Sequence, residues 1–121
     1  MGIQLNHIIV PAHDKHVSAE FLADVLGVPV AGEAGPFVQV AVDNGVTLDF
    51  MDANDFAEHH CAFLVGEAEF DATYQRIRDR GIPYWADPFH QQPGQTNTMN
   101  GGRGLYFSDP AGHNMEILTI P

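Results

Sequence analysis

The sequence predicts an α+β protein with one domain, residues 1–121, made of two βαβββ modules, residues 1–55 and 56–121. Two observations predict this class. Short segments rich in β-branched and aromatic residues alternate with two amphipathic helical patterns. The same order of elements then returns in the second half of the chain, and such internal repetition is a signal at the level of the fold. Because 45% of the residues are hydrophobic, the chain can form a substantial core.

The first module is expected to begin with a strand over residues 5–10, which Pro11 ends. Asp14 is a suitable N-cap for the helix that follows, and Gly27 ends that helix. Apolar residues at i, i+4 and i+8 mark the buried face of the helix: Val17, Phe21 and Val25. Three strands complete the module, over residues 28–30, 37–42 and 46–51, with an Asp-Asn-Gly turn before the last.

The second module repeats this order. A strand is expected over residues 59–65, followed by a helix that Gly81 ends. The apolar spacing of the helix is set by Phe70, Tyr74 and Ile77. A short strand is expected at residues 84–85, then a polar loop over residues 87–101. Two final strands, over residues 105–108 and 114–120, flank an Asp-Pro-Ala-Gly turn.

Histidines occupy matching points of the two modules. His7 lies 20 residues before Gly27, and His60 lies 21 residues before Gly81. Asp49 lies 22 residues after Gly27, and Glu116 lies 35 residues after Gly81. The longer loop of module two can account for the difference. The equivalence makes a shared role for these side chains more plausible than chance placement of single polar residues.

Four polar side chains therefore form a candidate metal site. Strand alternation places each of them on the face opposite the residues expected to pack on the helices. A carboxylate within the last, apolar strand is costly unless something pairs with it. Two imidazoles and one or two carboxylates suit a divalent transition metal. The predicted ligands are His7, His60 and Glu116, while Asp49 either adds a fourth ligand or hydrogen-bonds within the cavity. The competing interpretation is that each histidine is an ordinary core or edge residue.

Composition excludes several other classes. The net charge of −11 argues against nucleic acid, whose phosphates would be repelled. No apolar run has the length of a membrane span, so no membrane partner is expected. Cys61 is the single cysteine, and the absence of an intrachain disulfide fits a reducing cytoplasm. The expected partner is a small molecule.

The sequence resembles the vicinal oxygen chelate superfamily, the group of glyoxalases, bleomycin-resistance proteins and extradiol dioxygenases. The similarity covers nearly the whole chain, in residues 5–10, 21–27, 60–63, 70–83 and 102–118. The resemblance implies a glyoxalase-like fold, in which paired βαβββ modules form a cup-shaped mixed sheet with helices on the convex side. It implies metal ligands at His7, His60 and Glu116, a further carboxylate where Asp49 stands, and a homodimer whose site often draws on both chains.

The resemblance leaves the reaction open, because this superfamily hosts many chemistries. The predicted function is that of a metal-dependent enzyme acting on a small oxygen-bearing substrate chelated to Fe, Zn, Ni or Mn. The reaction is either a glyoxalase-type isomerisation (lyase branch) or an extradiol-type dioxygenation. The alternative is a metal-free, drug-binding protein like those of bleomycin resistance. Scarcity of basic residues disfavours glutathione, phosphonate and coenzyme A substrates.

The polar loop and the strand after it supply further candidates. A loop of this length in a small domain is often a lid or a binding loop. The catalytic candidates are His90, Tyr106 and Glu116. His90 is either a general acid or base or an exposed loop residue. Tyr106 either orients an oxyanion or fills the cup. Arg103 is either a clamp for a substrate carboxylate or a turn residue. The candidate substrate-binding residues are Trp85, Phe89, Arg103 and Tyr106.

Overall fold

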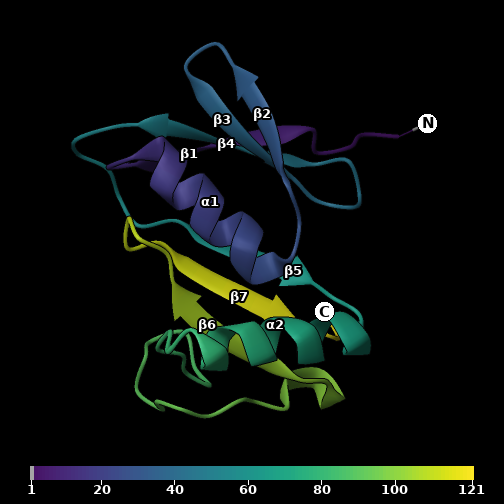
Figure 1. The fold of residues 1–121 in the computed structure, drawn as a ribbon. Helices are drawn as coiled ribbons and strands as arrows, with labels where there is room; N and C mark the ends of the chain where they lie inside the picture. The colour runs from purple at the N-terminus through teal and green to yellow at the C-terminus, as the bar shows by residue number, and fades with distance from the viewer. Residues whose placement is uncertain (1) are drawn as a thin grey trace. The chain divides into compact units, whose positions relative to one another are not determined.

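The computed structural model describes residues 2–121 and separates into two compact units, Met1–Ala57 and Glu58–Pro121. Each unit has its own sheet and its own helix (Figure 1). The boundary falls two residues beyond the predicted one between modules one and two. The α+β class is confirmed, with the strands divided between two sheets. No helix in residues 2–121 is long and apolar enough to cross a membrane.

The first unit has the predicted βαβββ order. Its elements are β1 (His7–Ala12), α1 (Lys15–Leu26), β2 (Val30–Ala34), β3 (Phe37–Ala41) and β4 (Thr47–Asp52). The sheet has the order β1-β4-β3-β2, in which β1 and β4 are parallel and the other pairs antiparallel. The Asp14 carboxylate accepts hydrogen bonds from two backbone N–H groups of the first turn of α1, and Gly27 ends the helix with a φ of 72°.

Helix α1 covers one face of this sheet. Val10, Val40 and Phe50 on the strands and Leu22 on the helix are all fully buried. Residues one position along each strand point to the opposite face, which therefore carries the polar candidates of this unit. Strand β2 starts where the predicted strand ended, because a tight turn at Gly35, with a φ of 58°, folds the five residues 30–34 back on β3.

The second unit contains β5 (His60–Leu64), α2 (Glu67–Asp79), a short 3₁₀ helix (Met99–Gly101), β6 (Gly104–Ser108) and β7 (Asn114–Leu118). The sheet has the order β5-β7-β6, with β5 and β7 parallel and β6 and β7 antiparallel. Phe70, Phe107 and Ile117 are fully buried in its core. The strand predicted at residues 84–85 is reduced to single bridges from Trp85 to Pro93 and to Tyr106.

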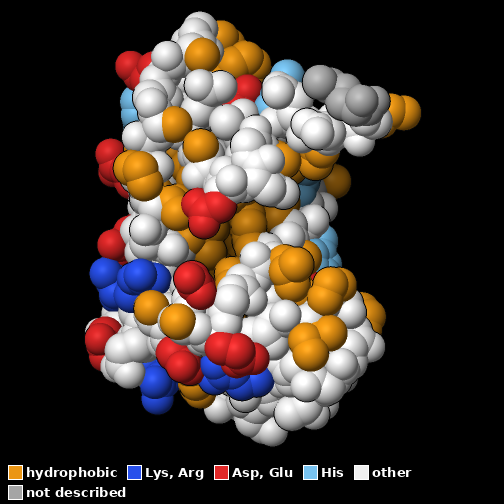
Figure 2. Space-filling view, turned by 90° about the vertical axis from the view of Figure 1, so that its right-hand side faces the viewer, with side chains coloured by type: hydrophobic (Ala, Val, Ile, Leu, Met, Phe, Trp, Pro, Cys, Tyr) orange, Lys and Arg blue, Asp and Glu red, His pale blue; other side chains and the backbone are white. Residues whose placement is uncertain are grey.

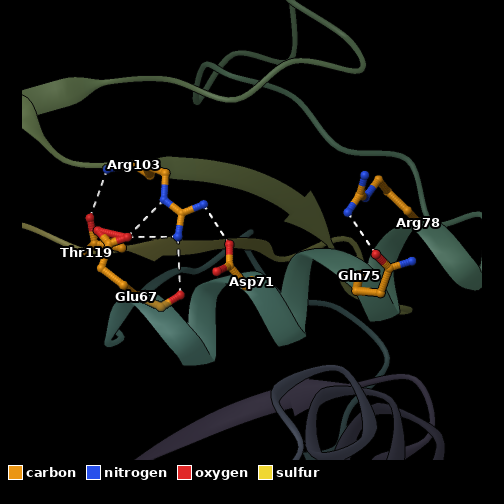
Figure 3. A network of polar contacts seen from close by, with 6 residues as sticks. All are labelled: Glu67, Asp71, Gln75, Arg78, Arg103 and Thr119. Carbon is orange, nitrogen blue, oxygen red and sulfur yellow. Dashed lines mark hydrogen bonds and ion pairs between the residues drawn. The ribbon is translucent and has the colours of Figure 1, made fainter.

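Arg103, just before β6, forms hydrogen bonds and ion pairs with α2 (Figure 3). All three of its guanidinium nitrogens donate to the helix, to the carboxylates of Glu67 and Asp71 and to the carbonyl oxygen of Glu67. The guanidinium also lies 4.4 Å from the centre of the Phe70 ring. Thr119 completes the network by accepting the backbone N–H of Arg103. These contacts make Arg103 a connection between a strand and a helix.

Candidate metal site

The centre of the candidate site is a pair of side chains on neighbouring strands of the second unit. His60 begins β5, Glu116 lies in the middle of β7, and the parallel register places Ala62 beside Glu116. Because side chains two residues apart share a face, His60 and Glu116 project from the same side of the sheet. The Nε2 atom of His60 lies 2.9 Å from Oε1 of Glu116. The side chain of His60 is 46% exposed and that of Glu116 only 12%, so the pair opens to solvent on the histidine side.

Tyr106 lies next to this pair on the other neighbouring strand. It is directly opposite Glu116 in the antiparallel register of β6 and β7. Its ring meets that of His60 edge-on, with centroids 5.8 Å apart. Burial, the charge of Glu116 and a hydrogen bond to Glu116 raise the pKa of Tyr106 to about 12, with a further contribution from Asp87. At neutral pH, Tyr106 is therefore a neutral phenol that donates to the carboxylate.

The pair has the chemistry and spacing of two ligands of one metal ion. Imidazole nitrogen and carboxylate oxygen are donors suited to Fe, Zn, Mn or Ni. Two ligand atoms about 2.1 Å from an ion and at right angles to each other lie about 3.0 Å apart, and the observed separation is 2.9 Å. In residues 2–121 no group of three or more His, Cys, Asp or Glu side chains is gathered that could hold a metal ion. The second unit thus brings together two of the candidate ligands.

The other two ligand candidates lie in the first unit. His7 is exposed at the start of β1, where its Nδ1 atom lies 2.7 Å from Oδ1 of Asn6. Asp49 is buried on β4, and its Oδ1 atom accepts hydrogen bonds from Thr47 at 2.9 Å and from Gln39 at 3.2 Å. Strand register places Thr47 beside His7, so both candidates belong to one face of this sheet. Asp49 thus makes hydrogen bonds within its own sheet.

The long loop contributes a fixed wall beside the His60–Glu116 pair. His90 is half-buried and stacks on Trp85, with ring planes 1° from parallel and centroids 3.8 Å apart. Its Nε2 atom lies 2.9 Å from Oδ1 of Asn114, which shares a strand face with Glu116. The exposed loop histidine considered as an alternative is therefore not observed. His90 has a φ of 57°, a left-handed conformation that costs a non-glycine residue about 1–2 kcal/mol, so these contacts offset a local strain.

Other hydrogen bonds tie the same loop down along its length. The carboxylate of Asp87 accepts the backbone N–H groups of residues 91 and 92. The side chain of Asn97 donates to the carbonyl of Ala86. Backbone hydrogen bonds in both directions join Trp85 to Tyr106 on β6. The loop predicted to be a lid or a binding loop is thus an extension of the sheet, with Phe89, 80% exposed, at its outer side.

The chain has few basic side chains, and two of those in the second unit already contact groups on helix α2. The guanidinium of Arg103, a candidate clamp for a substrate carboxylate, lies against α2 and donates to two carboxylates of that helix. Arg78 contacts Gln75 and the ring of Tyr74 on the same helix. On the face drawn in Figure 2, the blue Lys and Arg side chains lie in the part that carries the second unit, and red carboxylates accompany them. A strongly anionic substrate would therefore meet few unpaired positive charges on this face.

A buried polar cluster near the last turn went unnoticed in the sequence. His113 is fully buried, and its Nδ1 atom accepts the backbone N–H of His59 at 2.8 Å. Asp109 accepts the backbone N–H groups of Ala111 and His113 through Oδ1, while its buried Oδ2 atom has no hydrogen-bond partner among the described residues. Cys61 is also buried, and burial together with the charge of Asp109 raises the pKa of its thiol.

Asp109 should make stability depend on pH. Burial raises the pKa of Asp109 above its usual 3.8, against the N–H donors and the charge of His113, which lower it. The contribution of Asp109 to the free energy of unfolding is therefore fully present below pH 3.8, where the carboxyl is protonated. It is lost as the pH rises through the pKa of the folded state. The free energy of unfolding of the wild type, relative to Asp109→Asn, should be larger at pH 4 than at pH 7 in urea titrations. The exposed Asp43→Asn should show no such trend, and a difference that grows with pH would contradict the prediction.

The sequence profile of the Glyoxalase/Bleomycin resistance protein/Dioxygenase superfamily matches residues 4–117. The chain belongs to this superfamily. Among curated members, it is 25% identical to "Metallothiol transferase FosB" of Staphylococcus saprophyticus subsp. saprophyticus, over 95% of this chain and 76% of that protein. It is 26% identical to "Glutathione transferase FosA" of Serratia marcescens, over 93% and 78% of the two chains. The name of the first shows that metal-dependent enzymes occur in the superfamily.

Two solved structures within the superfamily resemble the chain much more strongly. "Oxidase ChaP-H2" is 55% identical, with a TM-score of 0.97 over 100% of this chain and 96% of that one. "Oxidase ChaP-H1" is 54% identical, with a TM-score of 0.96 over 99% and 98%. The lactoylglutathione lyase from Agrobacterium tumefaciens is 20% identical, with a TM-score of 0.73 over 96% and 92%, and shares the fold alone. The profile match confirms the membership of the superfamily that was expected from the sequence, and the solved structures confirm the glyoxalase-like fold.

Proposed function

We propose that the chain is a metal-dependent oxidoreductase that uses dioxygen to oxidise a small, oxygen-bearing substrate. The observation that carries the proposal is identity of 54–55% with two proteins named oxidases, over essentially the whole of each chain. The lactoylglutathione lyase is only 20% identical, so the glyoxalase-type branch has much weaker support. The scarcity of basic side chains, five in all, supports a substrate without phosphate or phosphonate groups.

The proposed ligands are His60 and Glu116, with His7 as the third on the strength of its matching position in the repeat. Two histidines and one carboxylate, with other positions open, are the pattern expected of non-haem Fe(II). Bound Fe(II) would supply Lewis acidity and one-electron chemistry with dioxygen. Asp49 is not needed for this ligand count, because its Oδ1 atom already accepts two hydrogen bonds within its own sheet.

The remaining residues would hold the ligands and the substrate in place. The hydroxyl of Tyr106 donates to Glu116 and orients the carboxylate. The stacked rings of Trp85 and His90 would provide a flat apolar wall for the substrate. His90, as a general base, would accept a proton from a substrate hydroxyl, since imidazole titrates near neutrality. Phe89 is an additional proposed contact at the outer side of the loop.

Dioxygen uptake tests this proposal. Protein purified without a His-tag and loaded anaerobically with Fe(II) should consume dioxygen when it is mixed with at least one member of a panel of catechols and other vicinal diols. The same preparation should not isomerise a hemithioacetal of glutathione, and Zn(II)-loaded protein is the matched control. Turnover of the hemithioacetal without dioxygen uptake would replace the proposal by the lyase branch. Metal below about 0.1 equivalents, with a cationic drug bound, would replace it by the binding protein.

A further inference from the structure

The amide of Asn114 occupies an unusual place between the loop and the strand that carries Glu116. It is buried, and both of its polar atoms contact the loop. Its Nδ2 atom lies 3.0 Å from the carbonyl oxygen of Pro88, and its Oδ1 atom lies 2.9 Å from Nε2 of His90. One side chain thus holds two loop residues that are two positions apart.

The chemistry of these contacts fixes every donor and acceptor. A backbone carbonyl oxygen can only accept, so the atom of Asn114 that faces Pro88 must be the NH₂ group. The atom that faces His90 is then the amide oxygen, which can only accept as well. A hydrogen bond between this oxygen and the ring of His90 requires the hydrogen to be on Nε2. Neutral His90 must therefore carry its hydrogen on Nε2 and its lone pair on Nδ1.

We infer that Asn114 is a positioning residue that locks His90 in the Nε2–H tautomer, so that proton transfer takes place at Nδ1 of His90. The inference rests on the proposed function only for the transfer step, and the tautomer itself does not depend on it. In that step the O–H bond of the substrate breaks and an N–H bond forms at Nδ1. The resulting imidazolium keeps its Nε2–H bond to Asn114, whose oxygen then stabilises a positive charge.

Two further contacts support this role. The stack on Trp85, with planes 1° from parallel, fixes the plane of the imidazole while Asn114 fixes its rotation within that plane. Three titratable groups lie on the segments that hold His90. The backbone carbonyl of Asp87 accepts the N–H of His90, and the carboxylate of Asp87 accepts the N–H groups of residues 91 and 92. Tyr106 is joined to Trp85 by backbone hydrogen bonds, and Glu116 lies on the strand of Asn114. Among the described residues, no hydrogen bond involves Nδ1 of His90.

Nitrogen-15 NMR tests the tautomer in the full chain. In protein labelled with [¹⁵N]histidine, at a pH about two units above the usual histidine pKa of about 6.5, two-bond ¹H–¹⁵N spectra distinguish the two neutral tautomers. The signals of His90 are those lost in His90→Gln. We expect a single Nε2–H tautomer with a proton protected from exchange. Observation of the Nδ1–H tautomer in the wild type would overturn the inference without any variant.

Two variants of similar size separate positioning from packing. Asn114→Asp keeps an acceptor toward His90 and loses the donor to Pro88, whereas Asn114→Leu removes both, so the two variants differ in the contact to His90. We expect Asn114→Leu to lose the protected Nε2 proton and to lower kcat at least 10-fold, with KM and bound metal within about twofold of the wild type, because general-base catalysis contributes about 10²–10⁴-fold. Asn114→Asp should retain the proton and most of kcat. An unchanged proton in Asn114→Leu would overturn the inference. Absence of dioxygen uptake in the wild type, with the tautomer as expected, would instead count against the proposed function.

Discussion

His60→Ala and Glu116→Gln are each expected to reduce Fe(II) affinity by about 100-fold or more and to abolish measurable dioxygen uptake. Loss of an outer residue that merely supports a ligand costs about 10–100-fold in affinity or activity, and removal of a ligand itself should cost at least as much. The two side chains lie 2.9 Å apart on adjacent strands, so each variant removes half of the ligand pair in the second unit. Metal analysis after dialysis and the oxygen electrode measure the two effects.

The first unit offers a matched control pair on its surface. His16 and Glu33 also place an imidazole nitrogen and a carboxylate oxygen near each other, at 3.4 Å, with side chains that are 53% and 66% exposed. His16→Ala and Glu33→Gln should leave metal content and dioxygen uptake unchanged. Stoichiometric metal in His60→Ala would refute the assignment of this ligand, and loss of metal in His16→Ala would show that the effect is not specific to the candidate site.

Phe107→Ala is expected to destabilise the second unit by about 3–5 kcal/mol. Phe107 is fully buried in β6, next to Tyr106 and opposite Met115 of β7, so its removal leaves a cavity behind the strand that supports the site. Trp85 is the single tryptophan and belongs to the same unit, and its fluorescence during urea unfolding reports the stability of that unit.

Phe89→Ala makes the same change of side chain at an exposed position and is the control for Phe107→Ala. Phe89 is 80% exposed, so its loss should alter the free energy of unfolding by no more than about 0.5 kcal/mol. If Phe89 contacts the substrate as proposed, KM should rise while stability is retained. A loss of several kcal/mol in Phe89→Ala, or none in Phe107→Ala, would contradict the packing described for β6.

Much of the fold could be predicted because local signals agree with the final structure. Asp14 and Gly27 delimit α1 by capping chemistry that the sequence displays directly. The prediction of a strand at residues 84–85 was wrong in extent. Trp85 pairs only with Pro93, within the same loop, and with Tyr106, and local propensity does not indicate such single bridges. Strand β2 was placed too early, because the turn at Gly35 determines which residues can pair with β3.

For the candidate site, the sequence predicted the closeness of two side chains better than it predicted their surroundings. Repetition and strand alternation singled out His60 and Glu116, which the structure brings together. Asn114 was missed, because its importance comes from two loop residues more than twenty positions away. The partners of Arg103 on α2 were missed for the same reason. Contacts between distant segments have no periodic signal in the sequence.

The order of strands in the second unit has a consequence for biosynthesis. Strand β7 is the last of the three to be made and lies between the other two. Until residues 114–118 have left the ribosome, β5 has no partner in this sheet, and β6 has only its bridges to Trp85 and Asn97. Until then, the edges of two strands are exposed, a situation that favours association with other chains. Glu116 lies on β7, the same strand that completes this sheet. A nascent chain therefore cannot bring Glu116 beside His60 before the sheet has formed.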